Sequence, residues 1–149
     1  MARFRFRLQS VLDIKLRLEE QQRNAFAAAN KRLQEENDKL DELYARKESL
    51  EEEGRRLRDS TLKIQDIIEN EEAIARIKDF IEDQKAQVRL WEMKVEEERV
   101  KLVDMITERK MYERLREKAF DDFLEEEKHS EGVENDEHNS FVYGTNSAQ

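Results

Sequence analysis

The chain has 149 residues, of which 44% are charged and 37% are hydrophobic, and its formal net charge is -9 at pH 7. This is too little apolar material for a layered globular core of that length, so the apolar residues need another way to become buried. Cysteine is absent, which excludes disulfides and thiolate metal sites. No segment approaches the run of about 20 apolar residues that spans a bilayer, and no apolar signal core is visible, so we expect a cytoplasmic protein.

The net charge is concentrated near the C-terminal end. Residues 121–138 contain nine acidic residues and one lysine, whereas the rest of the chain is close to neutral. Binding of nucleic acid depends on Lys and Arg that neutralise phosphates, and the chain has no excess of them. Nucleic acid is therefore not an expected partner.

The N-terminal part begins with an alternation and continues with a heptad pattern. Residues 2–7 read Ala-Arg-Phe-Arg-Phe-Arg, and this period of two suits an extended segment better than a helix. From Leu8 a heptad series predicts a first helix over about residues 8–57, with one four-residue step between Ala29 and Leu33 that resembles a stutter. The series occupies positions 8, 11, 15, 18, 22, 25 and 29, and then 33, 36, 40, 43, 47, 50, 54 and 57.

A second heptad series runs without a break from Ile67 to Phe123 and predicts a helix over about residues 62–128. Near the end of the first series stands Gly54, the only glycine of the helical part. Three residues of the types that cap helices come after that series, namely Asp59, Ser60 and Thr61. We therefore predict a turn at about residues 52–62. The predicted fold is all-α, a long two-helix antiparallel coiled-coil hairpin over residues 1–128, and one continuous helix is the alternative.

The hairpin hypothesis makes further structural predictions. With a turn near residue 59, facing residues have numbers that add up to about 118, and residues beyond about 114 overhang the first helix. Trp91 then faces a cluster of small residues around Ala27, where an indole has room. Residues 129–149 are rich in acids, Asn, Ser and Gly and have no period, which predicts a disordered acidic tail.

The sequence offers no pattern for catalysis or for a cofactor. Both histidines, His129 and His138, lie in the predicted tail, which supplies no rigid frame for a metal. The three glycines are far apart and form no phosphate-binding loop. A two-helix rod also has no enclosed pocket in which paired carboxylates could act as acid and base. We therefore expect neither an enzyme nor a bound cofactor or metal.

Apolar residues outside the heptad series either widen the buried face or form partner surfaces. Tyr44 and Phe80 are the strongest candidates for a partner surface, because polar residues flank them in the middle stretch of the hairpin. The others are Leu12, Ile14, Leu16, Phe26, Leu90, Met93, Val100, Val103, Ile106, Met111 and Leu115. The end of the hairpin opposite the turn carries a second candidate surface, which we name the open-end surface and which comprises Phe4, Phe6, Leu8, Leu12 and Leu115, with Arg3, Arg5 and Arg7 beside it.

The opening Phe4-Arg5-Phe6-Arg7-Leu8-Gln9-Ser10-Val11-Leu12 resembles the N-terminal signature of the FliJ family of bacterial flagellar export proteins. The similarity extends to about residue 128 and includes the stretches 84–96 and 110–118. It implies a coiled coil similar to the central stalk of rotary ATP synthases, whose open end docks in the pore of a hexameric export ATPase. It also implies contacts with the cytoplasmic domain of the export gate and with export chaperones, at the cytoplasmic face of the cell membrane.

The resemblance also assigns the gate contact to the middle of the hairpin. The matching positions, together with Tyr44, form what we name the mid-hairpin surface: Leu43, Tyr44, Leu50, Ala73, Ile77, Phe80 and Gln84. Three other functions remain open, namely the stalk of a virulence type III secretion system, a general holdase chaperone and a passive dimerising scaffold. Only the Phe-x-Phe-x-Leu-Gln opening favours the flagellar branch.

Overall fold

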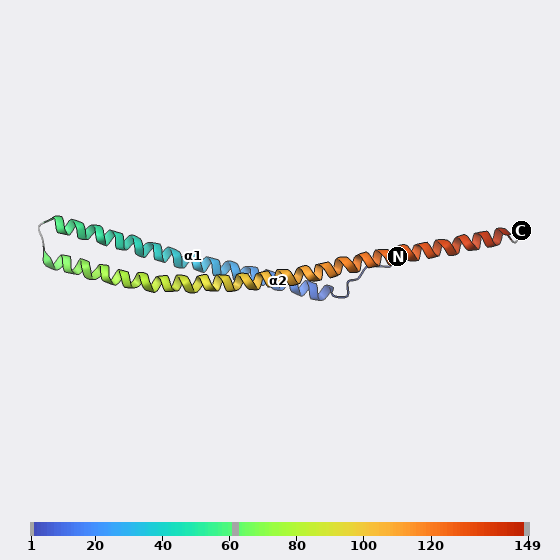
Figure 1. Ribbon diagram of the computed structural model, residues 1–149, viewed down its shortest axis with the longest axis horizontal. Coiled ribbons are helices and arrows are strands. Elements are labelled where there is room, and N and C mark those ends of the chain that lie inside the picture. Colours follow the sequence, from blue (N-terminus) through green and yellow to red (C-terminus); the bar gives the residue numbers. More distant parts are fainter. Residues whose placement is uncertain (1, 61–62, 148–149) are drawn as a thin grey trace. The chain divides into compact units, whose positions relative to one another are not determined.

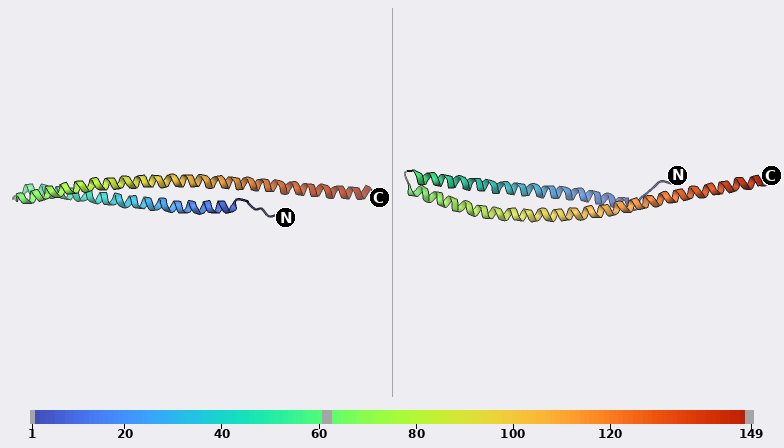
Figure 2. Two further views of the ribbon diagram at one scale, coloured as in Figure 1. Left: turned by 90° about the horizontal axis from the view of Figure 1, so that it is seen from below. Right: turned by 45° about the horizontal axis from the view of Figure 1, so that its top comes forward.

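The computed structural model describes residues 2–60 and 63–147. Within these residues the chain forms two helices and no strand: α1 spans Gln9–Asp59 and α2 spans Ile64–Ser147. The two helices run in opposite directions, which Figures 1 and 2 show from three sides. The predicted two-helix antiparallel hairpin is therefore confirmed.

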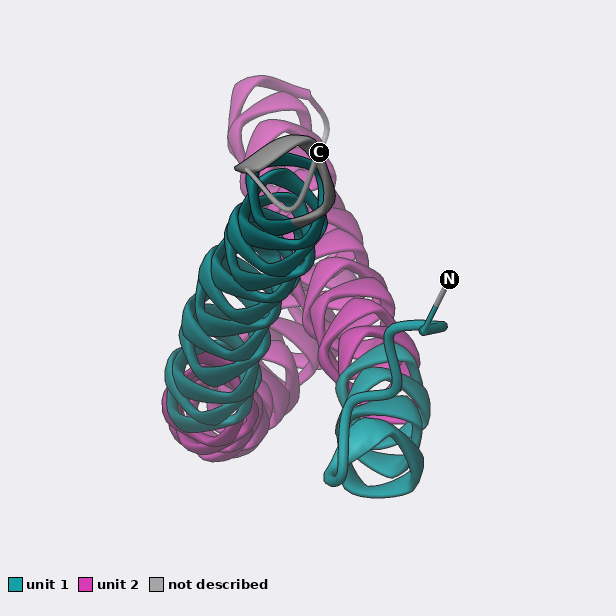
Figure 3. Ribbon diagram, turned by 90° about the vertical axis from the view of Figure 1, so that its right-hand side faces the viewer, with its two compact units in different colours: residues 1–20, 104–149 teal, residues 21–103 magenta. Residues whose placement is uncertain are grey.

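The chain divides into two compact units, coloured separately in Figure 3. Unit 1 combines Met1–Glu20 with Asp104–Gln149, and unit 2 is Gln21–Val103, which includes the turn. In each unit a segment of α1 packs against a segment of α2, because heptad-spaced apolar side chains on both helices need a facing surface to become buried.

The face that α1 presents to α2 follows an unbroken heptad series, which differs from the predicted one. Leu18 is 40% exposed and Ala25 is also exposed, whereas Glu19 and Phe26 are covered in their place. The predicted stutter after Ala29 is therefore wrong. The covered series occupies positions 8, 12, 15, 19, 22, 26, 29, 33, 36, 40, 43, 47, 50, 54 and 57.

The predicted series on α2 is confirmed, because each of its positions from Ile67 to Phe123 is buried or half-buried except Arg116. The pairing of large with small residues is confirmed as well. Trp91 shares a hollow with Ala25, Ala28 and Ala29, and the Arg32 guanidinium lies 5.4 Å from the centre of the indole ring. The small side chains leave room for the indole, as dense packing requires.

The turn lies later than predicted, because Gly54 is an interior residue of α1 with ordinary helical geometry. The chain leaves α1 after Asp59, and the Ser60 hydroxyl donates to the Leu57 carbonyl (3.5 Å) instead of capping α2. The first bonds of α2 run from the N–H groups of Asp66 and Ile67 to the Lys63 carbonyl. Thr61, the third cap candidate, lies outside the described residues.

Three side-chain amides in the described part of unit 2 reach from one helix to a backbone carbonyl of the other. Gln22 donates to Glu98 (3.0 Å), Gln84 donates to Glu36 (2.9 Å), and Asn70 donates to Leu50 (2.9 Å). These contacts recur every fourteen residues, and the two numbers in each pair add up to 120, close to the predicted 118. Sliding one helix by a heptad would separate all three donors from their acceptors, so the amides fix the register.

The C-terminal part of α2 differs from the irregular tail that the sequence predicted for residues 129–149. The helix continues to Ser147, and each described side chain from Lys128 to Gly144 is exposed. The segment contains no proline, and its glycines do not adopt the left-handed conformation that ends many helices. Nothing in the covalent structure therefore forces α2 to stop near residue 128.

Candidate partner-binding surfaces

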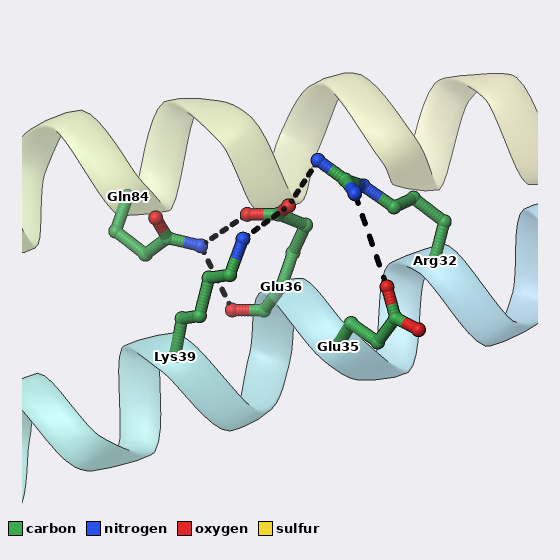
Figure 4. A network of polar contacts seen from close by, with 5 residues as sticks. All are labelled: Arg32, Glu35, Glu36, Lys39 and Gln84. Atoms are coloured by element: carbon green, nitrogen blue, oxygen red, sulfur yellow. Dashed lines mark hydrogen bonds and ion pairs between the residues drawn. The ribbon is translucent and has the colours of Figure 1, made fainter.

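A buried carboxylate lies at the centre of unit 2 in a cluster of polar contacts (Figure 4). The Gln84 side-chain amide, besides its bond to the Glu36 carbonyl, donates to Glu36 Oε2 at 2.6 Å. Arg32 and Lys39 reach the other oxygen of the same carboxylate, at 3.0 and 3.2 Å. The hydrogen bond from Gln84, followed by the two cations, lowers the pKa of Glu36 against the opposing effect of burial.

The same arrangement occurs a second time with the helices exchanged. Gln22 of α1 donates to Glu98 Oε2 at 2.6 Å, and Lys94 and Lys101 lie 3.2 and 3.6 Å from the other oxygen. The hydrogen bond from Gln22 is the main cause that lowers the pKa of Glu98. Each helix therefore carries a Gln, a basic residue, a Glu and a Lys at identical spacing, an internal repeat that the sequence analysis missed: Gln22, Arg32, Glu36 and Lys39 in α1 match Gln84, Lys94, Glu98 and Lys101 in α2.

The mid-hairpin surface in unit 2 is only partly accessible. Phe80 is 56% exposed and Tyr44 is 42% exposed, and Lys85 Nζ lies 6.0 Å from the centre of the Tyr44 ring. Ile77 is buried between the helices and supports the surface from below. The other four members are half-buried: Leu43, Leu50, Ala73 and Gln84.

Tyr44 and Phe80 do not form a single patch. Lys85, which reaches Tyr44, follows Phe80 by five residues on α2, and this spacing corresponds to a rotation of about 140° around the helix axis. The buried strip of Ile81 and Val88 runs between these two directions. Tyr44 and Phe80 therefore flank the packed seam from its two sides.

At the open-end surface, the segment before α1 packs on α2. The Phe4 ring lies 5.1 Å from the ring of Phe120 and 5.5 Å from that of Phe123, and the Arg116 guanidinium lies 5.5 Å from Phe4. The predicted overhang of α2, covered by the aromatic lead-in, is thus confirmed within unit 1. Phe4 takes part in this cluster and presents only part of its ring to solvent.

The remaining members of the open-end surface differ in accessibility. Leu115 is 44% exposed, Phe6 and Leu8 are half-buried, and Leu12 is 4% exposed because it belongs to the covered series of α1. Other exposed apolar side chains of unit 1 lie outside this surface and include Ile14, Leu16, Leu18 and Met111. The sequence analysis placed three of them outside the heptad series and assigned Leu18 wrongly to it.

Charged side chains connect the helices of unit 1. Arg109 Nε donates to Glu19 Oε2 at 2.6 Å and its Nη2 donates to Glu19 Oε1 at 3.2 Å, a two-point contact that also raises the pKa of Arg109. Lys15 contacts Glu108 at 3.0 Å. The contact with Arg109 explains why Glu19 occupies a covered position that an apolar residue was expected to fill.

A further apolar surface lies on α2 in unit 2, and neither predicted surface includes it. Leu90, Trp91 and Met93, with the stems of Lys94 and Glu97, line a shallow hollow of about 480 Å³. Met93 and Leu90 are among the most exposed apolar side chains of this unit. The sequence analysis noted both residues as apolar positions outside the series but gave them no partner.

Comparisons with known proteins complete the description. The family model for the flagellar FliJ protein matches residues 4–148. Neither the curated proteins nor the solved structures contain a match to the chain. In the part of the chain that the structure describes, no helix is long and apolar enough to cross a membrane, and no group of three or more His, Cys, Asp or Glu residues fits a metal ion.

Proposed function

Because the chain belongs to the FliJ family of flagellar proteins, we propose that it is an accessory subunit of the flagellar type III export apparatus that couples the hexameric export ATPase to the export gate. Proteins of this family are non-enzymatic components of flagellar export. The coupling role goes beyond family membership. It is supported by the presence of a separate accessible apolar surface in each unit. A protein that couples two partners needs two such surfaces.

The surface in unit 1 suits the pore of the ATPase ring. Leu115 and Met111 on α2, with Ile14 and Leu18 on α1, expose apolar area that the packing of the two helices leaves uncovered. A ring that surrounds this end would remove that area from water, and the favourable free energy scales with the area removed. Leu12 supports the surface by its packing and does not contact the ring directly.

The surface in unit 2 suits the cytoplasmic domain of the export gate. Phe80 and Tyr44 are large, exposed and rigid, and aromatic residues of this kind dominate the energy of many protein interfaces. Since they flank the seam from its two sides, a gate segment that contacts both must wrap around the hairpin. This arrangement also gives the protein a peripheral position at the cytoplasmic face of the membrane.

A separation-of-function experiment tests the proposal. Replacing Met111 and Leu115 by Ser should abolish stimulation of the purified export ATPase and leave binding to the gate domain unchanged. Replacing Tyr44 and Phe80 by Ala should have the opposite effect. These four side chains are exposed or outside the covered series, so their loss should leave the helical content intact.

Met93→Ser is the matched control, because it removes an exposed apolar side chain that belongs to neither surface. The proposal is wrong if both double variants lose both activities while remaining as helical as the parent. It is also wrong if the unmodified chain leaves the ATPase rate unaltered.

Binding of export chaperones or of export clients is a second candidate function, and the hollow at Leu90 and Met93 favours it. This apolar area needs a cover that neither proposed partner supplies. If it grips clients, the chain should suppress the aggregation of unrelated unfolded proteins, and Met93→Ser should weaken that effect. A pure coupling subunit should show no such suppression.

A further inference from the structure

The lead-in before α1 is a short amphipathic segment laid on a helix. The side chains of Phe4 and Phe6 are half-buried, whereas those of Arg3, Arg5 and Arg7 are exposed. Phe4 anchors the segment through its contacts with Phe120 and Phe123. One face of the lead-in thus rests on α2 and the other presents guanidinium groups to solvent, which is the side-chain alternation of a β-strand.

The backbone of this segment has hydrogen-bonding capacity that the chain itself does not use. Among the described residues, no hydrogen bond involves the backbone of residues 2–5. The Phe6 carbonyl accepts from the N–H of Gln9 at 3.1 Å. In an extended segment successive residues direct their N–H and C=O groups to opposite edges. The edge shared by Ala2, Phe4 and Phe6 is therefore partly used, and the edge of Arg3 and Arg5 is open.

The charges on the exposed face are also without partners. No described residue forms an ion pair or hydrogen bond with Arg3, Arg5 or Arg7. Arg3 and Arg5 place two positive charges in a row on this face, about 7 Å apart at the rise of a strand, and Arg7 follows in the turn that leads into α1. A second copy of the segment would put like charges opposite one another, which is unfavourable. The row is complementary to a strand with carboxylates on the same face.

We propose that residues 2–6 add as a β-strand to an exposed sheet edge of the export ATPase, beside a strand that carries acidic side chains. The inference rests on the proposed function for the identity of this partner. Strand addition would satisfy the open backbone edge, and carboxylates on the neighbouring strand would pair with the arginines. The aromatic contacts on α2 hold the segment in the extended form before it binds, which reduces the entropy lost on association.

The test compares two substitutions that remove the same charge. Arg5→Gln removes the guanidinium, and Arg5→Pro removes the guanidinium together with the backbone N–H of the open edge. We expect Arg5→Gln to weaken binding of the full chain to the purified ATPase hexamer by about threefold, and Arg5→Pro to weaken it by about a further tenfold. Arg3→Gln and Arg3→Pro, on the same edge, should show the same order.

Ala2→Pro is the control, because it removes an N–H group from the other edge and alters no charge, so it should bind as the unmodified chain does. Residues 2–5 precede α1, so circular dichroism and the thermal midpoint should be the same for all variants. Equal affinities for the Pro and Gln variants at both positions would overturn strand addition in favour of recognition by side chains alone.

Two further outcomes distinguish strand addition from membrane binding and from a failure of the ATPase contact itself. If the arginine substitutions leave ATPase binding unchanged but abolish binding to vesicles that contain anionic lipid, the row binds a membrane and the inference is wrong. If the unmodified chain does not bind the ATPase at all, the proposed ATPase contact fails and the inference falls with it. If the unmodified chain binds the ATPase and the Pro and Gln variants bind equally, strand addition is rejected and the proposed ATPase contact stands.

Discussion

The side chain of Asn70 occupies the space beside Gly54, where an added Cβ atom would come 2.5 Å from Asn70 Oδ1. Asn70 is itself held by its bond to the Leu50 carbonyl and is 6% exposed. Gly54 is therefore a glycine because the facing helix sends a buried amide into its position. Its role is packing inside a helix rather than reversal of the chain.

This relationship predicts how an alanine at position 54 behaves. In an ordinary helix interior the change from Gly to Ala stabilises by about 1 kcal/mol. Here Gly54→Ala displaces Asn70 from its acceptor, and a buried donor without a partner costs about 1–3 kcal/mol. We expect a net loss of stability in urea unfolding. In the Asn70→Ala background the same change should stabilise, and equal effects in both backgrounds would contradict this role of Asn70.

The two buried carboxylates predict sensitivity to acid. The pKa values of Glu36 and Glu98 are lowered from 4.5 in the folded protein, so their contribution to stability is present above pH 4.5 and is lost as the pH falls through the lower folded values. The thermal midpoint should therefore fall in that range. The double variant Glu36→Gln with Glu98→Gln should show a smaller fall.

The control for the acid experiment is Glu35→Gln with Glu97→Gln, which removes the same number of charges from exposed neighbouring positions. Its midpoint should follow that of the unmodified chain through the acid range. If the control variant shows the same reduced fall as the Glu36→Gln, Glu98→Gln variant, general charge repulsion rather than the two clusters causes the effect.

The contact between Gln22 and Glu98 predicts a reciprocal rescue. Gln22→Glu alone places two carboxylates against each other at a buried position, so the thermal midpoint should fall at pH 7. Adding Glu98→Gln restores one amide and one carboxylate with their positions exchanged, and should recover part of the loss, because a carboxylate at position 22 cannot replace the bond that Gln22 donates to the Glu98 carbonyl. Additive losses in the double variant would mean that the two side chains do not form a specific pair.

The aromatic contact at the start of the chain predicts a local effect. Phe4→Ala removes two ring contacts worth about 0.5–1.5 kcal/mol each, and should release the lead-in from α2. Trypsin should then cleave after Arg5 and Arg7 faster, while the thermal midpoint changes little. Phe80→Ala, an exposed aromatic in unit 2, should leave the cleavage rate unchanged, and an equal acceleration there would argue against the contact.

The exposed end of α2 predicts that truncation is tolerated. Since each described side chain from Lys128 to Gly144 is exposed, ending the chain after Lys128 removes little buried area. The thermal midpoint should be unchanged within error in a scan followed by circular dichroism. A substantial decrease would reveal packing of this segment against the rest of the protein.

The sequence by itself determined the two helices, their antiparallel pairing and most of the covered positions. Heptad spacing is a local property of the chain. Few other registers of residues 67–123 would place as many apolar residues on one face of the helix. The match of Trp91 with the alanines of α1 also followed, because residue size and an approximate register were sufficient to predict it.

Only the tertiary structure decided that the polar Glu19 is covered in place of Leu18, and why position 54 carries no side chain. Glu19 lies in the seam rather than Leu18 because Arg109 faces it, and position 54 is a glycine because Asn70 fills the space beside it. The free energy of such a residue depends on a partner some 16 to 90 positions away, which no local pattern contains. The position of Phe4 was decided in the same way, because its ring packs on Phe120 and Phe123 of α2. An apolar residue near a chain end is held in place only where another part of the protein offers a surface to pack on.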